Sequence, residues 1–196
     1  MGKIFYIMGK SASGKDSIYR ELMRDHVGEL KKIVLYTTRP VRDGEKDGRE
    51  YHFVSEERYQ ELEAAGKIIE ERGYHTVYGL WRYFTADDGT VDPEKENYLG
   101  IGTLESYRKL RGYYGKDRLC PIYVEVEDGE RLKRAIAREE TQEVPKYEEM
   151  CRRFLADSQD FSEEKIREAE IDFRFLNTDF NTCLRDIEKY IISVLY

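Results

Sequence analysis

Short apolar runs alternate with stretches of helical periodicity along most of the chain. The run at residues 3–8 is almost entirely apolar and ends at Gly9, as expected for a strand that is buried on both faces. Apolar residues then follow at helical spacing from residue 16 to about residue 26. The same criteria predict further strands at 33–36, 67–71, 76–80, 98–101, 121–126 and 171–176, and further helices at 55–65, 103–111, 129–140, 145–160 and 180–195.

This order of elements predicts an α/β fold. Strands that alternate with helices form a largely parallel sheet covered on both faces, so we expect a doubly wound parallel sheet. The turn signal at residues 87–89 is expected to mark the tip of a hairpin. Because no internal repeat or low-complexity linker interrupts the pattern, residues 1–196 are expected to form a single domain.

The composition restricts the class of protein. Of the 196 residues, 40% are hydrophobic and 37% are charged, which is typical of a globular domain. The net charge of −7 disfavours a broad nucleic-acid-binding surface, and no apolar stretch reaches the length of about 20 residues that crosses a bilayer. Three widely spaced cysteines indicate neither a disulfide framework nor a metal knuckle. We therefore expect a cytoplasmic protein with no nucleic-acid or membrane partner.

The loop between the first strand and the first helix has the spacing of a phosphate-binding loop. Gly9 and Gly14 are five residues apart and Lys15 follows directly, which is the G-x-x-x-x-G-K pattern of a Walker A loop. The glycines let backbone N–H groups approach phosphate oxygens, and the lysine supplies positive charge near the outer phosphates. An ordinary glycine-rich turn is disfavoured by the strand–loop–helix context. The expected ATP-binding residues of this phosphate loop (residues 9–17) are Gly9, Lys10, Ser11, Ala12, Ser13, Gly14, Lys15, Asp16 and Ser17.

The residue after the lysine departs from the Walker A pattern, in which a Ser or Thr hydroxyl binds Mg²⁺. Here it is Asp16, whose carboxylate is a hard oxygen ligand. Its negative charge beside a polyphosphate is unfavourable unless a metal ion intervenes. Ser17 offers the next hydroxyl, so Asp16 and Ser17 are the candidate Mg²⁺ ligands.

The segment 37–54 is a second candidate binding element. Arg39 and Arg42 are three residues apart, and Tyr51 follows nine residues after Arg42. Two planar guanidinium groups can grip a monophosphate through paired hydrogen bonds, and a tyrosine hydroxyl can donate to the same group. The alternative is a solvated charged loop, which the neighbouring phosphate loop disfavours.

Together, the Walker A loop and the segment TTRPVRDGEKDGREYHF resemble the guanylate kinase family. The resemblance implies a P-loop kinase that uses Mg²⁺ and transfers the γ-phosphoryl group of ATP to GMP. It also implies that Glu70 reads the guanine base, that Tyr78 belongs to the family's Y-Y-G strand, and that Asn177 lies near the adenine of ATP. The acceptor-binding residues that it implies are Arg39, Arg42, Tyr51, Glu70 and Tyr78, and the catalytic residues are Lys15, Arg134, Arg138 and Arg153.

The resemblance further implies three parts within the single domain. The core is expected to comprise residues 1–35, 98–133 and 161–196, the acceptor-binding region residues 36–97, and a small helical lid residues 134–160. Both appendages are expected to move when substrates bind.

The departures from the family pattern concern the base. Leu35 and Leu80 stand at or near positions that carry hydroxyl groups in the family, and the strand that normally ends in D-x-D has glycine at both positions, the second being Gly102. Asp16 is a candidate substitute for the missing metal carboxylate. The insert 81–97 contains three aspartates, and a solvated hairpin tip is the expected role for it.

Two other functions stay open at this point. One is a kinase of the same scaffold for another phosphorylated acceptor such as ribose 1,5-bisphosphate, whose enzymes share the Gly-Lys-Asp-Ser loop and read no base. The other is a catalytically silent guanylate-kinase-like binding module, against which the retained Lys15 argues. The oligomeric state is also open.

Overall fold

A five-stranded parallel sheet forms the centre of the protein. The computed structural model describes residues 2–76 and 79–196. Its central sheet has the strand order β2-β7-β1-β8-β9, and every neighbouring pair is parallel. The strands are β1 (Ile4–Met8), β2 (Lys31–Lys32), β7 (Tyr98–Gly102), β8 (Leu119–Glu125) and β9 (Phe175–Leu176).

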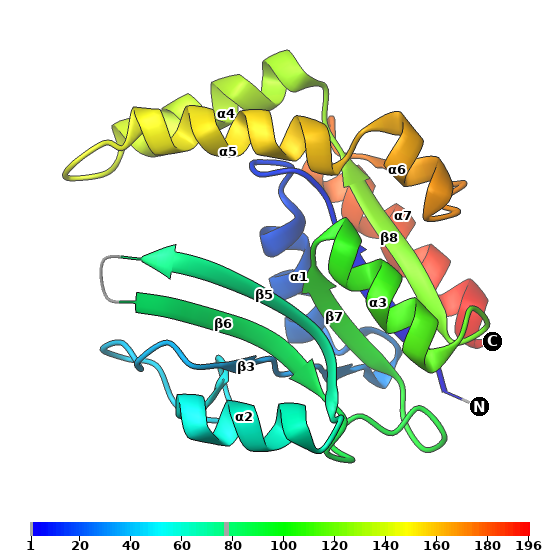
Figure 1. Ribbon diagram of the computed structural model, residues 1–196. Helices are drawn as coiled ribbons and strands as arrows, with labels where there is room; N and C mark the ends of the chain where they lie inside the picture. Colours follow the sequence, from blue (N-terminus) through cyan, green and yellow to red (C-terminus); the bar gives the residue numbers. More distant parts are fainter. Residues whose placement is uncertain (1, 77–78) are drawn as a thin grey trace.

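Helices cover both faces of this sheet, which confirms the doubly wound arrangement (Figure 1). Alternate residues of the fully buried β1 point to opposite sides. Tyr6 packs with α3 and α6 on one face, and Ile7 packs with α1 and α7 on the other. The covering helices are α1 (Lys15–Arg24), α3 (Leu104–Tyr114), α6 (Glu163–Glu168) and α7 (Phe180–Leu195), with a short 3₁₀ helix, η1 (Val27–Glu29), after α1.

A second sheet of four strands stands beside the central one, in the order β4-β3-β6-β5. Helix α2 (Glu56–Ala64) packs Tyr59 and Leu62 against Phe84 of this sheet. The Ser55 hydroxyl accepts the Arg58 N–H and begins α2, as its sequence predicts. The strands are β3 (Tyr36–Thr37), β4 (His52–Phe53), β5 (Ile68–Thr76) and β6 (Gly79–Ala86).

Two further helices, α4 (Asp128–Glu140) and α5 (Tyr147–Asp160), form a pair, and α5 contacts the phosphate loop through Asp157 and Ser11. Figure 1 shows this helical pair extending from the core toward the side on which the second sheet lies. No helix among the described residues is both long and apolar enough to span a membrane.

Four details of the predicted secondary structure are wrong. The predicted strand 76–80 takes in the last residue of β5 and the first two residues of β6. Most of the predicted strand 33–36 lies between β2 and β3, which belong to different sheets, because the chain leaves the central sheet here. The turn at 87–89 follows β6 and is no hairpin tip, since the antiparallel pair is β5 with β6. The predicted strand 171–176 is too long, because only Phe175–Leu176 pairs with β8. The short helix α6 before it was not predicted.

Tyr6 fills the space that side chains on β7 would occupy. Tyr6 lies on β1, which pairs with β7 so that Tyr6 is opposite Gly100. A Cβ atom on Gly100 would lie 2.7 Å from Cδ2 of Tyr6, and one on Gly102 would lie 2.1 Å from the Tyr6 hydroxyl oxygen. That hydroxyl is 2.7 Å from Oγ of Ser106 in α3. The glycines of β7 and the tyrosine of β1 are therefore a matched set.

Replacing Gly102 by Ala is expected to lower the free energy of unfolding by about 1–3 kcal/mol, because the added methyl group overpacks the buried ring of Tyr6. The matched control is Gly112→Ala in α3, where a Cβ atom would meet nothing within 4 Å. This control is expected to be neutral or to add up to about 1 kcal/mol. Urea unfolding followed by circular dichroism measures both variants.

Tyr6→Phe in the Gly102→Ala background should recover part of the lost stability, because it removes the nearest clashing atom. Equal stability of the Gly102→Ala variant and the wild type would contradict the proposed packing of Tyr6.

Candidate active site

The phosphate loop connects β1 to α1 and is fixed from behind by Asn177. The side-chain amide of Asn177 donates to the carbonyl oxygen of Ser13 at 2.8 Å. Gly14 caps α1 with a left-handed φ of 88°, and a Cβ atom there would lie 2.4 Å from Nδ2 of Asn177. Both facts require glycine at this position. Helix α1 starts at Lys15, so its N-terminal N–H groups and dipole favour an anion at the loop.

A cleft of about 650 Å³ opens beside the phosphate loop. We call it the acceptor cleft. It brings together parts of the chain that are far apart in sequence: Lys15 and Asp16 from the start of α1, the second sheet and its loops, and α5. The residues that line it are Lys15, Asp16, Leu35, Arg42, Tyr51, Arg72, Tyr74, Trp81, Tyr83, Ile101, Gly102, Thr103, Glu149 and Arg153.

The predicted monophosphate-binding residues take different positions. Arg42 and Tyr51 line the acceptor cleft. Arg39 is only 3% exposed, and its guanidinium donates to both carboxylate oxygens of Glu45, at 2.8 and 3.0 Å. Its Cζ atom also lies 5.6 Å from the ring centroid of Tyr51. Arg39 thus packs against the cleft wall, and Tyr78 lies outside the described residues.

Glu70, expected to face the base, is buried and paired with Arg72. Its Oε2 lies 3.3 Å from Nε of Arg72, and its Oε1 accepts the Thr85 hydroxyl at 3.0 Å. Burial raises the pKa of the Glu70 carboxyl, and the positive charge of Arg72 opposes that rise. Arg72, which the sequence patterns did not single out, lines the acceptor cleft.

Of the three predicted catalytic arginines on the helical pair, Arg153 shares the acceptor cleft with Lys15. Arg134 donates to the carbonyl oxygen of Asn177 at 3.1 Å, which places it behind the phosphate loop. Arg138 is about half exposed, and its nearest acidic partner is Glu139 at 3.8 Å. The structure therefore brings one of the three to the cleft and leaves the other two beside it.

The candidate metal ligands lie at the start of α1. The Asp16 side chain is 77% exposed and pairs with Lys15 at 3.0 Å, and Ser17 accepts a hydrogen bond from Arg20 at 3.2 Å. No group of three or more His, Cys, Asp or Glu side chains in the described part of the chain could hold a metal ion.

The acidic residues after β6 stay out of the cleft. Asp88 accepts a hydrogen bond from the Tyr36 hydroxyl, and Asp92 pairs with Lys95 at 2.8 Å. The expected hairpin tip is wrong for the insert 81–97, since residues 81–86 belong to β6. The aspartates after this strand lie in a polar loop and do not line the acceptor cleft.

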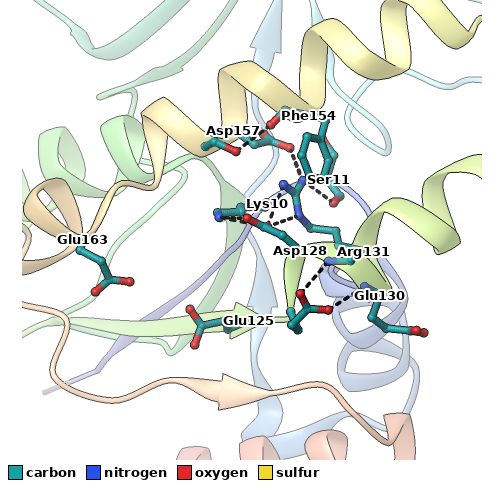
Figure 2. Close-up of polar contacts among 12 residues, drawn as sticks. Lys10, Ser11, Glu125, Asp128, Glu130, Arg131, Phe154, Asp157 and Glu163 are labelled. Carbon is teal, nitrogen blue, oxygen red and sulfur yellow. Dashed lines mark hydrogen bonds and ion pairs between the residues drawn. The ribbon is translucent and has the colours of Figure 1, made fainter.

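A buried arginine joins the phosphate loop to the helical pair. Arg131 of α4 is 1% exposed, and Figure 2 shows its guanidinium beside Asp128, Asp157 and Phe154. It lies 3.0 Å from Asp128, 3.1 Å from Asp157 and 4.0 Å from the ring centroid of Phe154. Asp157 in turn accepts the backbone N–H of Ser11 at 2.7 Å.

Local sequence does not reveal this network, because Arg131 is one more charged residue on a highly charged helix. The only local signal was an acidic residue three positions earlier, which is common on solvated helices. Along the sequence, Asp157 is 26 residues from Arg131. Ser11 of the phosphate loop, whose carbonyl oxygen also accepts from Arg131, is 120 residues from it.

Comparison with known proteins finds similar sequences and folds along nearly the whole chain. The family model described as guanylate kinase matches residues 1–194. The chain is 27% identical over 198 residues to a protein named guanylate kinase from Porphyromonas gingivalis, covering 100% of this chain and 99% of that protein. It is 30% identical over 191 residues to one from Nostoc sp., covering 95% and 88% respectively. A crystal structure of guanylate kinase from Anaplasma phagocytophilum has the same fold, with a TM-score of 0.64 at 20% identity, covering 98% of this chain and 85% of that one.

Replacing Arg131 by Met is expected to lower the free energy of unfolding by about 3 kcal/mol, because it leaves Asp157 and Asp128 without their buried partner. The matched control is Arg152→Met on α5, an arginine that is 64% exposed and should change stability little. Urea unfolding measures both, and equal effects of the two substitutions would refute the structural role of Arg131.

Proposed function

Because the chain belongs to the guanylate kinase family and is thus a nucleoside monophosphate kinase, we propose that it transfers the γ-phosphoryl group of ATP to GMP, giving ADP and GDP. The observation that carries this proposal is the shared acceptor cleft. It is lined by Lys15 of the phosphate loop together with Arg42 and Tyr51, so a donor phosphate and an acceptor phosphate can meet within it.

The proposed mechanism is direct transfer between two bound nucleotides, without a covalent intermediate on the protein. Lys15 and the N-terminus of α1 hold the outer phosphates of ATP, and Arg42 and Tyr51 hold the GMP phosphate. Arg153 supplies positive charge to the group in transfer. Catalysis then consists of alignment and charge stabilisation.

The remaining predicted residues are given supporting roles. Arg39 holds the Tyr51 ring in place, and Asn177 fixes the backbone of the phosphate loop. Arg134 and Arg138 lie on α4 and are proposed to reach the nucleotide when residues 134–160 close as a lid over the acceptor-binding region 36–97.

The donor set at the start of α1 fits Mg²⁺ in its nucleotide-bound form. Mg²⁺ prefers hard oxygen ligands and commonly uses one or two protein oxygens with phosphates and water. The exposed carboxylate of Asp16 and the hydroxyl of Ser17 are such ligands. When bound, the ion neutralises charge on the outer phosphates of ATP.

A second candidate acceptor is a phosphorylated sugar such as ribose 1,5-bisphosphate. It is favoured by Gly100 and Gly102, since β7 presents no carboxylate to a base.

The test is a coupled ADP-release assay with MgATP against GMP, dGMP, AMP, CMP, UMP and ribose 1,5-bisphosphate. Turnover of GMP and dGMP in preference to the other acceptors supports the proposal. Turnover of the sugar phosphate alone refutes it in favour of the second candidate. Binding of ATP without turnover of any acceptor refutes kinase activity on this set.

Lys15→Met is expected to lower kcat by about a hundredfold or more, because a charged group that stabilises the transferring phosphoryl is lost. The melting temperature should stay close to that of the wild type, since the ion pair of Lys15 with exposed Asp16 contributes little. Full activity in a folded Lys15→Met protein would exclude the mechanism.

Arg42→Met is expected to raise KM for GMP by about tenfold or more, because hydrogen bonds to charged groups contribute about 1.5–3 kcal/mol. KM for ATP should change little, since Arg42 is assigned to the acceptor. Steady-state kinetics with each substrate varied separately measures both values, and an unchanged KM for GMP would disprove the assignment of Arg42.

A further inference from the structure

Arg72 carries a charge that the proposed mechanism does not use. Side chains alternate along β5, so Glu70, Arg72 and Tyr74 lie on one face of the strand. Arg72 and Tyr74 line the acceptor cleft, and 16% of the Arg72 side chain is exposed. The Glu70 side chain is 0% exposed. This face of β5 therefore presents a guanidinium to an acceptor and keeps the carboxylate buried.

Glu70 is held in its buried position from two sides. The Thr85 hydroxyl donates to Oε1 at 3.0 Å, and Nη2 of Arg72 lies 3.5 Å from the same oxygen. Nε of Arg72 lies 3.3 Å from Oε2. If the carboxylate turned toward a base, Arg72 would lose its partner, and a buried charge without a partner is strongly unfavourable.

The side chains on the neighbouring wall of the cleft offer a base little polar chemistry. Leu35 and Ile101 are apolar, and Gly102 has no side chain. The hydroxyl of Thr103 already accepts the N–H of Ser106 at 3.2 Å, where it caps α3. Arg72 is thus the charged side chain that β5 contributes to a cleft also lined by these apolar residues.

Given the proposed function, we propose that Arg72 determines acceptor specificity by donating two hydrogen bonds to O6 and N7 of a 6-oxopurine, with Glu70 as its positioning residue. The planar fork of an arginine matches this edge of guanine, where two acceptors lie side by side. Hypoxanthine presents the same edge. Adenine presents an amino donor at position 6, which opposes a guanidinium. The acceptors are then 6-oxopurine nucleoside monophosphates, with or without a 2-amino group.

Direct recognition of the base by Glu70 predicts instead that 7-deaza-GMP is used as well as GMP and that IMP is used poorly. A carboxylate accepts hydrogen bonds and therefore pairs with the N1–H and 2-amino donors of guanine. Two analogues separate the alternatives, because IMP lacks the 2-amino group and 7-deaza-GMP lacks the N7 acceptor.

The first experiment measures kcat/KM of the wild-type protein for GMP, IMP, 7-deaza-GMP and AMP. Recognition by Arg72 predicts a value for IMP within about threefold of that for GMP. It predicts values for 7-deaza-GMP and AMP that are lower by about tenfold or more, the loss expected for a disrupted bidentate contact.

The second experiment measures the same ratios in variants. Arg72→Met is expected to lower kcat/KM for GMP by about tenfold or more and to abolish the preference for GMP over 7-deaza-GMP. Glu70→Gln is expected to raise KM for GMP and IMP together and to leave their ratio unchanged, because Glu70 acts only through Arg72. The matched control is Arg108→Met. Arg108 pairs with Glu168 at 3.1 Å and lines a neighbouring cavity that it shares with Arg72, but it does not line the acceptor cleft. It should leave every ratio unchanged.

The outcomes separate this inference from the proposed function. If GMP is turned over, but IMP falls by tenfold or more while 7-deaza-GMP is used fully, Glu70 reads the base and the inference is overturned. An unchanged preference for GMP over 7-deaza-GMP in folded Arg72→Met protein also overturns it. Turnover of ribose 1,5-bisphosphate alone overturns both proposals. Circular dichroism checks folding, and if Arg72→Met does not fold, the wild-type analogue series decides by itself.

Discussion

The buried guanidinium of Arg131 is the constraint on which the geometry of the site depends. A charge that is 1% exposed is tolerable only with matched partners, and Asp128 and Asp157 provide them from both helices of the helical pair. Because Asp157 also binds the N–H of Ser11, the same contacts fix the phosphate loop to α5. Arg153 lies one helical turn from Asp157, so its distance from the loop is set by this network.

The packing of Tyr6 against β7 explains where the acidic groups of the site can be. Its ring leaves room only for glycine at positions 100 and 102, so β7 cannot place carboxylates at the carboxyl edge of the sheet. Asp16, in the first turn of α1, is the acidic residue of the cleft that lies next to Lys15 of the phosphate loop. A metal ion held there would depend on one protein carboxylate and on oxygens of the nucleotide. One buried aromatic ring thus keeps carboxylates off this strand and leaves Asp16 as the proposed metal ligand of the loop.

Local patterns predicted the fold and the phosphate loop, whereas contacts between distant segments decided the rest of the site. The spacing of Gly9, Gly14 and Lys15 is a local property, and the family resemblance it supported is confirmed. Glu70 was identified by its position in a motif, but its burial depends on Arg72 and on Thr85 from the paired strand. The predicted strand ended at residue 71. Continuing its two-residue alternation would have placed Arg72 and Tyr74 on the same face.

The acceptor cleft is lined mainly by basic side chains, whereas the whole chain is acidic. This difference favours discrimination between acceptors through short-range contacts. The chain carries a net charge of −7, which opposes anionic nucleotides at long range. Among the described residues, four basic and two acidic side chains line the cleft: Lys15, Arg42, Arg72, Arg153, Asp16 and Glu149. Screening limits the long-range repulsion to about 8 Å at physiological salt, while partly buried groups are screened much less. Discrimination between acceptors therefore depends on which carboxylate each arginine of the cleft pairs with. Arg72 pairs with Glu70, whose side chain is fully buried.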